Sequence, residues 1–235
     1  MQELKESNYA LFFAKLNQDA TLKSEFISGL LEIKKVQKER FIEDLLKGTF
    51  GEIGISREEL GKQGIDLSGR PFFTFVRRVV RYKCPDFIID LFYDPGFRKR
   101  IVESGAVIFI GGRRFDSFYD DQLQRVKRLY GQFPELKYHL IFISNHNVFN
   151  SWIIQQGTDF GGMLSILEER LDPLTEEYIR IGSEAGPTSY CNAQQNLAPT
   201  IATCDGVIPE RVKPIQTDAQ GRVTAGTGYF VRYIK

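Results

Sequence analysis

Polar and basic side chains follow two short apolar runs in the middle of the chain. The first run, 106–110, leads into a turn rich in glycine and arginine, and the second, 138–143, leads into a polar loop. The candidate ligand-binding residues in these two segments are Gly111, Gly112, Arg113, Arg114, Ser144, Asn145 and Asn147. Guanidinium groups offer a fixed positive charge and paired N–H donors, and glycines expose backbone N–H groups. This combination suits a phosphate or a carboxylate.

Two residues of the same segments are candidates for proton chemistry. His146 is one of two histidines, and its ordinary pKa of about 6.5 allows it to act as a general acid or base. Asp116 is a second catalytic candidate, although its position before a helical pattern also suits a helix cap. A loop histidine that only bonds its asparagine neighbours remains an alternative. The two adjacent carboxylates of Asp120 and Asp121 are not sufficient evidence to predict a metal site. The sequence identifies no cofactor.

The elements that position these residues read as one strand–helix–strand unit. Ala106–Ile110 and Tyr138–Ile143 are short apolar runs, and Ser117–Tyr130 between them has a helical pattern. Such runs are typical of parallel strands buried on both faces. A right-handed crossover brings the carboxyl ends of both strands to the same sheet edge, where open α/β sheets bind ligands. The glycine turn matches neither the Gly-x-Gly-x-x-Gly pattern nor the P-loop.

Composition limits the classes of protein that fit. The 235 residues are 42% hydrophobic and 26% charged, with a net charge of +1, which predicts a soluble globular protein without a general affinity for nucleic acid or membranes. No apolar run reaches the roughly 18 residues of a membrane span. The first residues lack the pattern of a secretion signal, so we expect a cytoplasmic location. Three widely spaced cysteines argue against a disulfide framework, and a reactive Cys191 or Cys204 paired with His146 stays open.

The first quarter of the chain has helical spacing. Residues 7–64 contain an apolar stripe, a long helix expected at about 23–47, and a capping box at Ser56 and Glu59. Several glycines then precede Pro71. We therefore predict a helical region, residues 1–69, followed by a mixed α/β domain, residues 70–235, whose mixed sheet ends in an antiparallel hairpin around Asp218–Gly221.

Two N-terminal stretches carry a family resemblance. They are Phe12–Leu22, a phenylalanine-led helix with an aspartate turn, and Ile55–Leu60, a capped segment of the type Ser-x-Glu-Glu-Leu. Together they resemble the nitrogen-fixation-associated leader domain family. The resemblance implies a helical docking module for a protein partner. This chain has additional residues between the two stretches and no Gly-Gly processing site after Leu60, so a cleaved leader is not expected.

Other segments give further expectations. Pro71–Lys83 is an aromatic strand, and its cluster of Arg77, Arg78 and Arg81 suggests either a charged solvent face or a nucleic-acid-binding surface. Gly157, Gly161 and Gly162 suggest a mobile loop or lid, and 163–171 reads as a short helix.

The sequence supports three functional hypotheses. The first is an enzyme, a transferase or hydrolase, that binds an anionic small molecule or a modified peptide at the carboxyl edge of the sheet. The second is a non-catalytic protein-interaction or regulatory module. The third is a nucleic-acid binder that uses the arginine cluster, which the absence of a basic excess disfavours.

Overall fold

The chain folds as a mixed α/β protein around a parallel sheet. The computed structural model describes residues 11, 14–51, 57–164, 167–171, 178–182, 195–203, 212–221 and 223–231. The main sheet has six strands in the order β10-β7-β4-β1-β2-β3, and every neighbouring pair is parallel. Its strands are β1 (Phe72–Val76), β2 (Val107–Gly111), β3 (Leu140–Ile143), β4 (Phe160–Met163), β7 (Thr200–Thr203) and β10 (Gly228–Val231).

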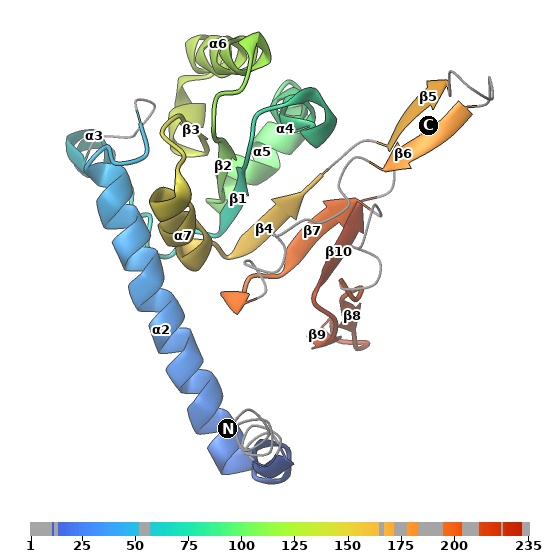
Figure 1. The fold of residues 1–235 in the computed structure, drawn as a ribbon. Coiled ribbons are helices and arrows are strands. Elements are labelled where there is room, and N and C mark those ends of the chain that lie inside the picture. Colours follow the sequence, from blue (N-terminus) through green and yellow to red (C-terminus); the bar gives the residue numbers. More distant parts are fainter. Residues whose placement is uncertain are drawn as a thin grey trace.

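The helices cover the part of the sheet built from β1, β2 and β3 (Figure 1). They are α2 (Ala20–Leu46), α3 (Arg57–Gln63), α4 (Pro85–Leu91), α5 (Pro95–Ser104), α6 (Ser117–Gln132) and α7 (Val148–Gly157), with short 3-10 turns η1 (Arg81–Lys83) and η2 (Pro134–Tyr138). Side-chain caps start several of them: Asp19 accepts from the N–H groups of Thr21 and Leu22, and Asp94 accepts from that of Phe97.

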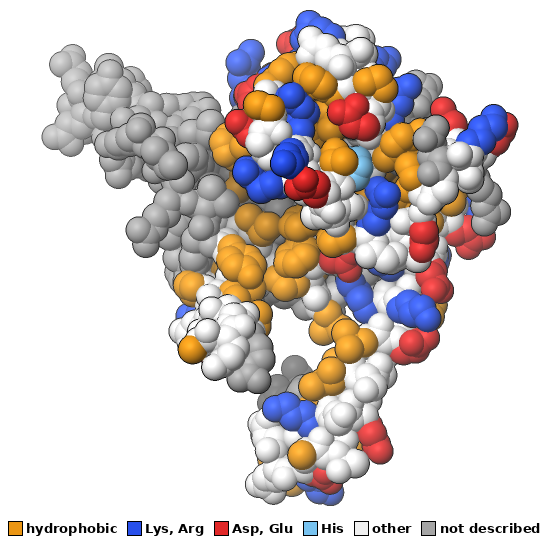
Figure 2. All heavy atoms as spheres, turned by 180° about the vertical axis from the view of Figure 1, so that it is seen from behind, with side chains coloured by type: hydrophobic (Ala, Val, Ile, Leu, Met, Phe, Trp, Pro, Cys, Tyr) orange, Lys and Arg blue, Asp and Glu red, His pale blue; other side chains and the backbone are white. Residues whose placement is uncertain are grey.

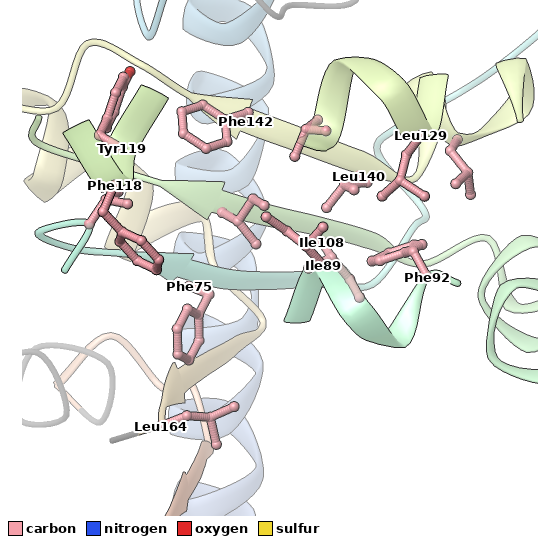
Figure 3. Close-up of a cluster of buried hydrophobic side chains, with 14 residues drawn as sticks. Phe75, Ile89, Phe92, Ile108, Phe118, Tyr119, Leu129, Leu140, Phe142 and Leu164 are labelled. Carbon is pink, nitrogen blue, oxygen red and sulfur yellow. The ribbon is translucent and has the colours of Figure 1, made fainter. Parts of the chain in front are cut away.

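The central strands separate two apolar cores. All residues of β2 and β3 are buried, so successive side chains enter the core on opposite faces. On one face, Ile108 and Phe142 pack with α4 and α6; Figure 3 shows this cluster. On the other face, Phe109 and Ile143 pack with α2. Burial on both faces explains why these strands read as continuous apolar runs.

The long helix α2 belongs to the second core. Phe41 is fully buried, and its ring centroid lies 5.3 Å from that of Phe50, 5.7 Å from that of Phe72 and 5.0 Å from that of Phe109. The sequence-based boundary near residue 70 therefore falls inside a shared core: α2 contributes to it from one side and β1 from the other. In Figure 1, the N-terminal half of α2 extends past the sheet.

Two lysines of α2 fasten it to the segment that joins α7 to β4. Lys34 Nζ donates to the carbonyl oxygens of Gln156, at 2.8 Å, and Thr158. Lys38 Nζ forms an ion pair of 2.5 Å with Asp159, whose carboxylate also accepts from the Phe72 N–H at 2.8 Å. The helix is thus tied to both the end of α7 and the start of β1.

The expected strand–helix–strand unit is present as β2, α6 and β3, and the expected C-terminal hairpin is present as β8 (Gln216–Thr217) and β9 (Val223–Ala225). That hairpin is separate from the main sheet, and the last strand, β10, joins the sheet in parallel. The parallel sheet therefore has more strands than the predicted strand–helix–strand unit, because β1 pairs with β2, and β4, β7 and β10 continue the sheet on the other side of β1.

Two sequence expectations are wrong. The helix expected at 163–171 is instead the end of β4 followed by β5 (Leu167–Leu171), which pairs antiparallel with β6 (Tyr178–Gly182). The lid expected around Gly157–Gly162 is the end of α7 and strand β4. Its glycines serve packing, since a Cβ at Gly157 would lie 2.4 Å from the Phe41 Cβ. Phe12, Phe13, Ile55, Ser56, Cys191 and Cys204 lie outside the described residues.

Candidate functional site

A pocket of about 540 Å³ lies at the carboxyl ends of the central strands. The loops after β1, β2 and β3 and the outer face of α7 supply its lining, which consists of Arg78, Arg113, His146, Asn147, Val148, Ser151, Trp152 and Gln155. The structure therefore brings Arg113, His146 and Asn147 together from the two segments that the sequence singled out. The crossover of β2, α6 and β3 is the physical reason, because it returns both loops to one edge.

Two arginines give the pocket its charge. Arg78 and Arg113 are exposed, and the described residues that line the pocket include no acidic side chain. Among the residues that the structure describes, neither arginine forms an ion pair. Arg114, in contrast, is bound to Asp120 at 2.6 Å and does not line the pocket. Uncompensated guanidinium groups that face one cavity favour an anionic occupant.

His146 lies between this pocket and a smaller recess of about 20 Å³. The recess has room for one water molecule and is lined by parts of β1, α7 and β4, including Thr74, Ser151 and Gly161. His146 is half-buried, and burial lowers the pKa of its imidazole below 6.5. The ring is therefore neutral at pH 7, which is the form that accepts a proton.

The glycines of the β2 turn bring three strands close together. The Arg77 N–H donates to the Gly111 carbonyl, and the Gly112 N–H donates to the Ile143 carbonyl, both at 2.9 Å. A Cβ at Gly112, where φ is +136°, would lie 1.8 Å from the Arg77 carbonyl oxygen. These glycines thus hold the β1 and β3 ends together, and the Gly112 N–H is engaged within the protein.

The polar loop after β3 is held in place by its own hydrogen bonds. The backbone N–H groups of Ser144 and Asn145 both donate to the Phe50 carbonyl, at 3.0 and 2.8 Å. Asn147 caps α7 by accepting from the Asn150 N–H, and Asn150 Nδ2 in turn donates to the Asn145 carbonyl. The loop therefore fixes the backbone on either side of His146 and aims α7 along the pocket.

Asp116 occupies a helix cap. Its carboxylate accepts from the Phe118 N–H at 2.9 Å at the start of α6, and the residue is exposed. It lines neither the pocket nor the recess next to His146. The geometry thus supports capping, and the catalytic role expected for Asp116 stays a prediction without support from the pocket.

The outer face of α7 is the part of the site that the sequence reasoning missed. Val148 and Trp152 are one turn apart, as are Ser151 and Gln155, and all four line the pocket. Trp152 remains 67% exposed. The usable signal was the helix cap at Asn147, which predicts a helix directly after the candidate histidine. Arg78 was considered in the sequence only as part of a charged solvent face or a nucleic-acid-binding surface.

The arginine cluster of Pro71–Lys83 is divided by the fold. Arg77 is 6% exposed, and its Nη1 donates to the Leu164 carbonyl at 3.2 Å, so it faces the protein interior. Arg78 faces the pocket, and the exposed Arg81 lies over the Phe118 ring. The three side chains do not form one continuous basic surface, which weakens the nucleic-acid hypothesis.

The far side of the sheet has an apolar cavity of about 330 Å³. It lies between β1, β4, β7 and helices α4 and α5, and Phe73, Phe75, Leu91 and Ile101 are part of its lining. Figure 2 shows this region as a hollow of hydrophobic side chains in the middle of the face. The described residues that line this cavity include no titratable side chain, so it is not a candidate for the chemistry of His146.

Comparison with models of protein families and with curated proteins gives no match. Within the described part of the chain, no helix is both long and apolar enough to span a membrane. The same residues contain no group of three or more His, Cys, Asp or Glu side chains arranged to hold a metal ion.

Proposed function

We propose that this protein is an enzyme that binds an anionic small molecule, one bearing a phosphate or a carboxylate, at the carboxyl edge of its sheet. Arg78 and Arg113 bind the anion, and His146 transfers the proton. The observation that carries the proposal is a pocket of about 540 Å³ whose described lining combines two arginines and a half-buried histidine and includes no acidic side chain.

The chemistry follows from the state of His146. A neutral imidazole takes the proton from a water or hydroxyl group as its oxygen attacks the phosphorus or carbonyl carbon of the ligand. The same imidazole, now protonated, gives that proton to the leaving oxygen, so the ring ends as it began. The two guanidinium groups stabilise the negative charge that develops on the ligand. A water nucleophile makes the enzyme a hydrolase, and an acceptor hydroxyl makes it a transferase.

The order of the strands supports this location. From β1 the chain proceeds outward through β2 and β3, and then returns to add β4, β7 and β10 on the other side of β1. Connections therefore diverge between β1 and β4, and open α/β sheets bind ligands at such a point. The recess beside His146 is lined by residues of both strands, including Thr74 and Gly161.

Thermal melting against phosphorylated and carboxylated metabolites tests the proposal. A ligand at 100 times its dissociation constant stabilises the fold by about 2.7 kcal/mol, which raises the melting temperature by about 5–10 °C. The double substitution of Arg78 and Arg113 by alanine should abolish that shift. Arg128→Ala on α6 is the control, because Arg128 is also exposed and does not line the pocket. A shift that survives the double substitution contradicts the proposal.

The second candidate, a protein-interaction module, is favoured by one observation. On one side of α2, Ile33 and Val36 lie three residues apart and are 56% and 57% exposed, and such a helical surface suits an apolar groove on a partner protein. If this surface is functional, Ile33→Glu should abolish the biological activity while leaving the melting temperature and the ligand shift unchanged.

A further inference from the structure

The pocket wall contains an unusually placed side chain. Trp152 is the only tryptophan of the chain, and it is 67% exposed at a pocket that also contains two arginines. A large ring left in water at a concave site marks a surface that gains free energy when it is covered. Its flat, amphipathic ring suits another planar ring as the covering group.

The surroundings of Trp152 extend this surface in an ordered way. Val148 precedes Trp152 by one helical turn, so the two side chains form a continuous apolar strip along α7. Ser151 and Gln155 form a parallel polar strip, and the Gln155 amide lies 3.2 Å from the Ser151 hydroxyl. A ring lying on the apolar strip would have hydrogen-bonding groups along its edge.

Other lining residues supply charge, and the pocket is large enough for a ligand that contacts both the apolar strip and the arginines. Arg78 and Arg113 come from the loops after β1 and β2, and Trp152 comes from α7. A volume of about 540 Å³ lies within the range of about 300–1,000 Å³ typical of cofactor and drug-sized ligands. An inorganic anion would use the arginines and leave the apolar strip uncovered.

We propose that the anionic ligand of this pocket is a nucleoside phosphate, whose base stacks on Trp152 while its phosphate binds Arg78 and Arg113. This inference depends on the proposed function, because it assigns a substrate class to the same anion site. Binding of a nucleoside phosphate differs from binding of a long nucleic-acid strand, because Trp152 and the two arginines line one bounded pocket.

Fluorescence titration tests the stacking directly, because the single tryptophan is the reporter. The probes are the 5′-monophosphates of adenosine, guanosine, cytidine and uridine, with ribose 5-phosphate and inorganic phosphate as ligands without a base. At least one nucleotide should quench the Trp152 emission and bind about 5- to 150-fold more tightly than ribose 5-phosphate, the range expected for stacking of one base.

Variants measured by calorimetry complete the test. Trp152→Leu should weaken nucleotide binding by about the same factor and leave ribose 5-phosphate unchanged, and Trp152→Phe should retain most of the affinity. Phe149→Leu is the matched control, since Phe149 is 83% exposed on the same helix and does not line the pocket.

The outcomes separate this inference from the function it depends on. If ribose 5-phosphate binds as tightly as every nucleotide, or if Trp152→Leu leaves nucleotide affinity unchanged, the nucleoside assignment is wrong and the anion site stands. If no phosphorylated or carboxylated compound binds, both proposals are wrong. If only long single strands bind, with strong salt dependence, the nucleic-acid hypothesis replaces both.

Discussion

Replacing Phe41 by alanine tests how firmly α2 is built into the sheet. The Phe41 side chain is fully buried and contacts the rings of Phe50, Phe72 and Phe109. It also packs against the backbone of α7 at Gly157. One residue of the helical region thus touches the segment before β1, the strands β1 and β2, and the helix that carries the pocket wall.

The expected loss of stability follows from what the substitution removes. Truncating a buried phenylalanine to alanine costs about 3–5 kcal/mol in lost transfer free energy and cavity formation. Three ring contacts, each contributing about 0.5–1.5 kcal/mol beyond burial, place Phe41→Ala at the upper end of that range. Because domains are stable by about 5–15 kcal/mol in total, the variant should lose a large share of its stability.

Urea unfolding followed by Trp152 fluorescence and by circular dichroism measures the effect. Both signals should shift together to lower urea, since α2 and the sheet share one core. Ile33→Ala on the same helix is the control, because Ile33 is 56% exposed, and it should change stability by less than about 0.5 kcal/mol. A Phe41→Ala loss below about 1 kcal/mol, or separate transitions for the two signals, would refute the shared core.

Three further predictions concern charge. Asp159→Asn should destabilise the fold by about 2 kcal/mol in urea unfolding, because it weakens the partly buried ion pair with Lys38. Glu43→Gln, in the exposed ion pair with Lys47, should cost less than about 0.5 kcal/mol. Equal losses for the two variants would contradict the role of Asp159. Turnover of a substrate should fall as the pH drops, with a midpoint below about pH 6.5, because His146 must be neutral to accept a proton and burial lowers its pKa. A His146→Gln variant that retains the wild-type rate and pH profile would exclude His146 as the general base. Stability should also fall as the pH drops below about 6.5, because the unfolded chain then binds protons at both histidines while burial lowers the pKa of His139 and His146 in the folded chain. An unfolding free energy that stays constant below that pH would contradict the burial of the two rings.

The part of the fold that the sequence predicts correctly is the part with the simplest physical signal. Strands β2 and β3 are buried on both faces, so their residues are uniformly apolar and bounded by polar turns. Helix α6 carries one buried face, which includes Val126 and Leu129, and a polar face. With right-handed crossover, these three elements are sufficient to bring Arg113 and His146 together.

Helix α7 escaped prediction because only some of its apolar residues, such as Ile154, lie on its buried face. Val148, Phe149 and Trp152 are 84, 83 and 67% exposed, whereas the polar Asn150 is buried and hydrogen-bonded. Hydrophobic periodicity identifies a helix by the side it buries. Here the same periodicity is interrupted by exposed apolar residues, two of which, Val148 and Trp152, line the pocket, so the failure of the pattern coincides with the candidate ligand surface.

Strand β4 was missed for a different reason, which depends on its neighbours. The sequence Phe-Gly-Gly-Met of 160–163 resembles a flexible loop, yet it pairs with β1 on one side and β7 on the other. A Cβ at Gly162 would lie 2.3 Å from Cδ2 of Phe75, so glycine is required where a large ring of the adjacent strand fills the space. A contact between residues so distant in sequence leaves no local pattern.

The two elements that the sequence patterns did not predict, α7 and β4, lie next to each other at the recess beside His146. Residues of α7 and β4 line the recess beside His146, together with β1 residues such as Thr74. Sequence patterns identify helices and strands by the apolar side chains that these elements bury against one another. A binding site instead keeps side chains exposed for a ligand, and natural sequences depart from local rules where function requires it. The apolar strip of α7 and the glycines of β4 are such departures, and both adjoin the proposed base. The location of the departures thus supports the pocket independently of its arginines.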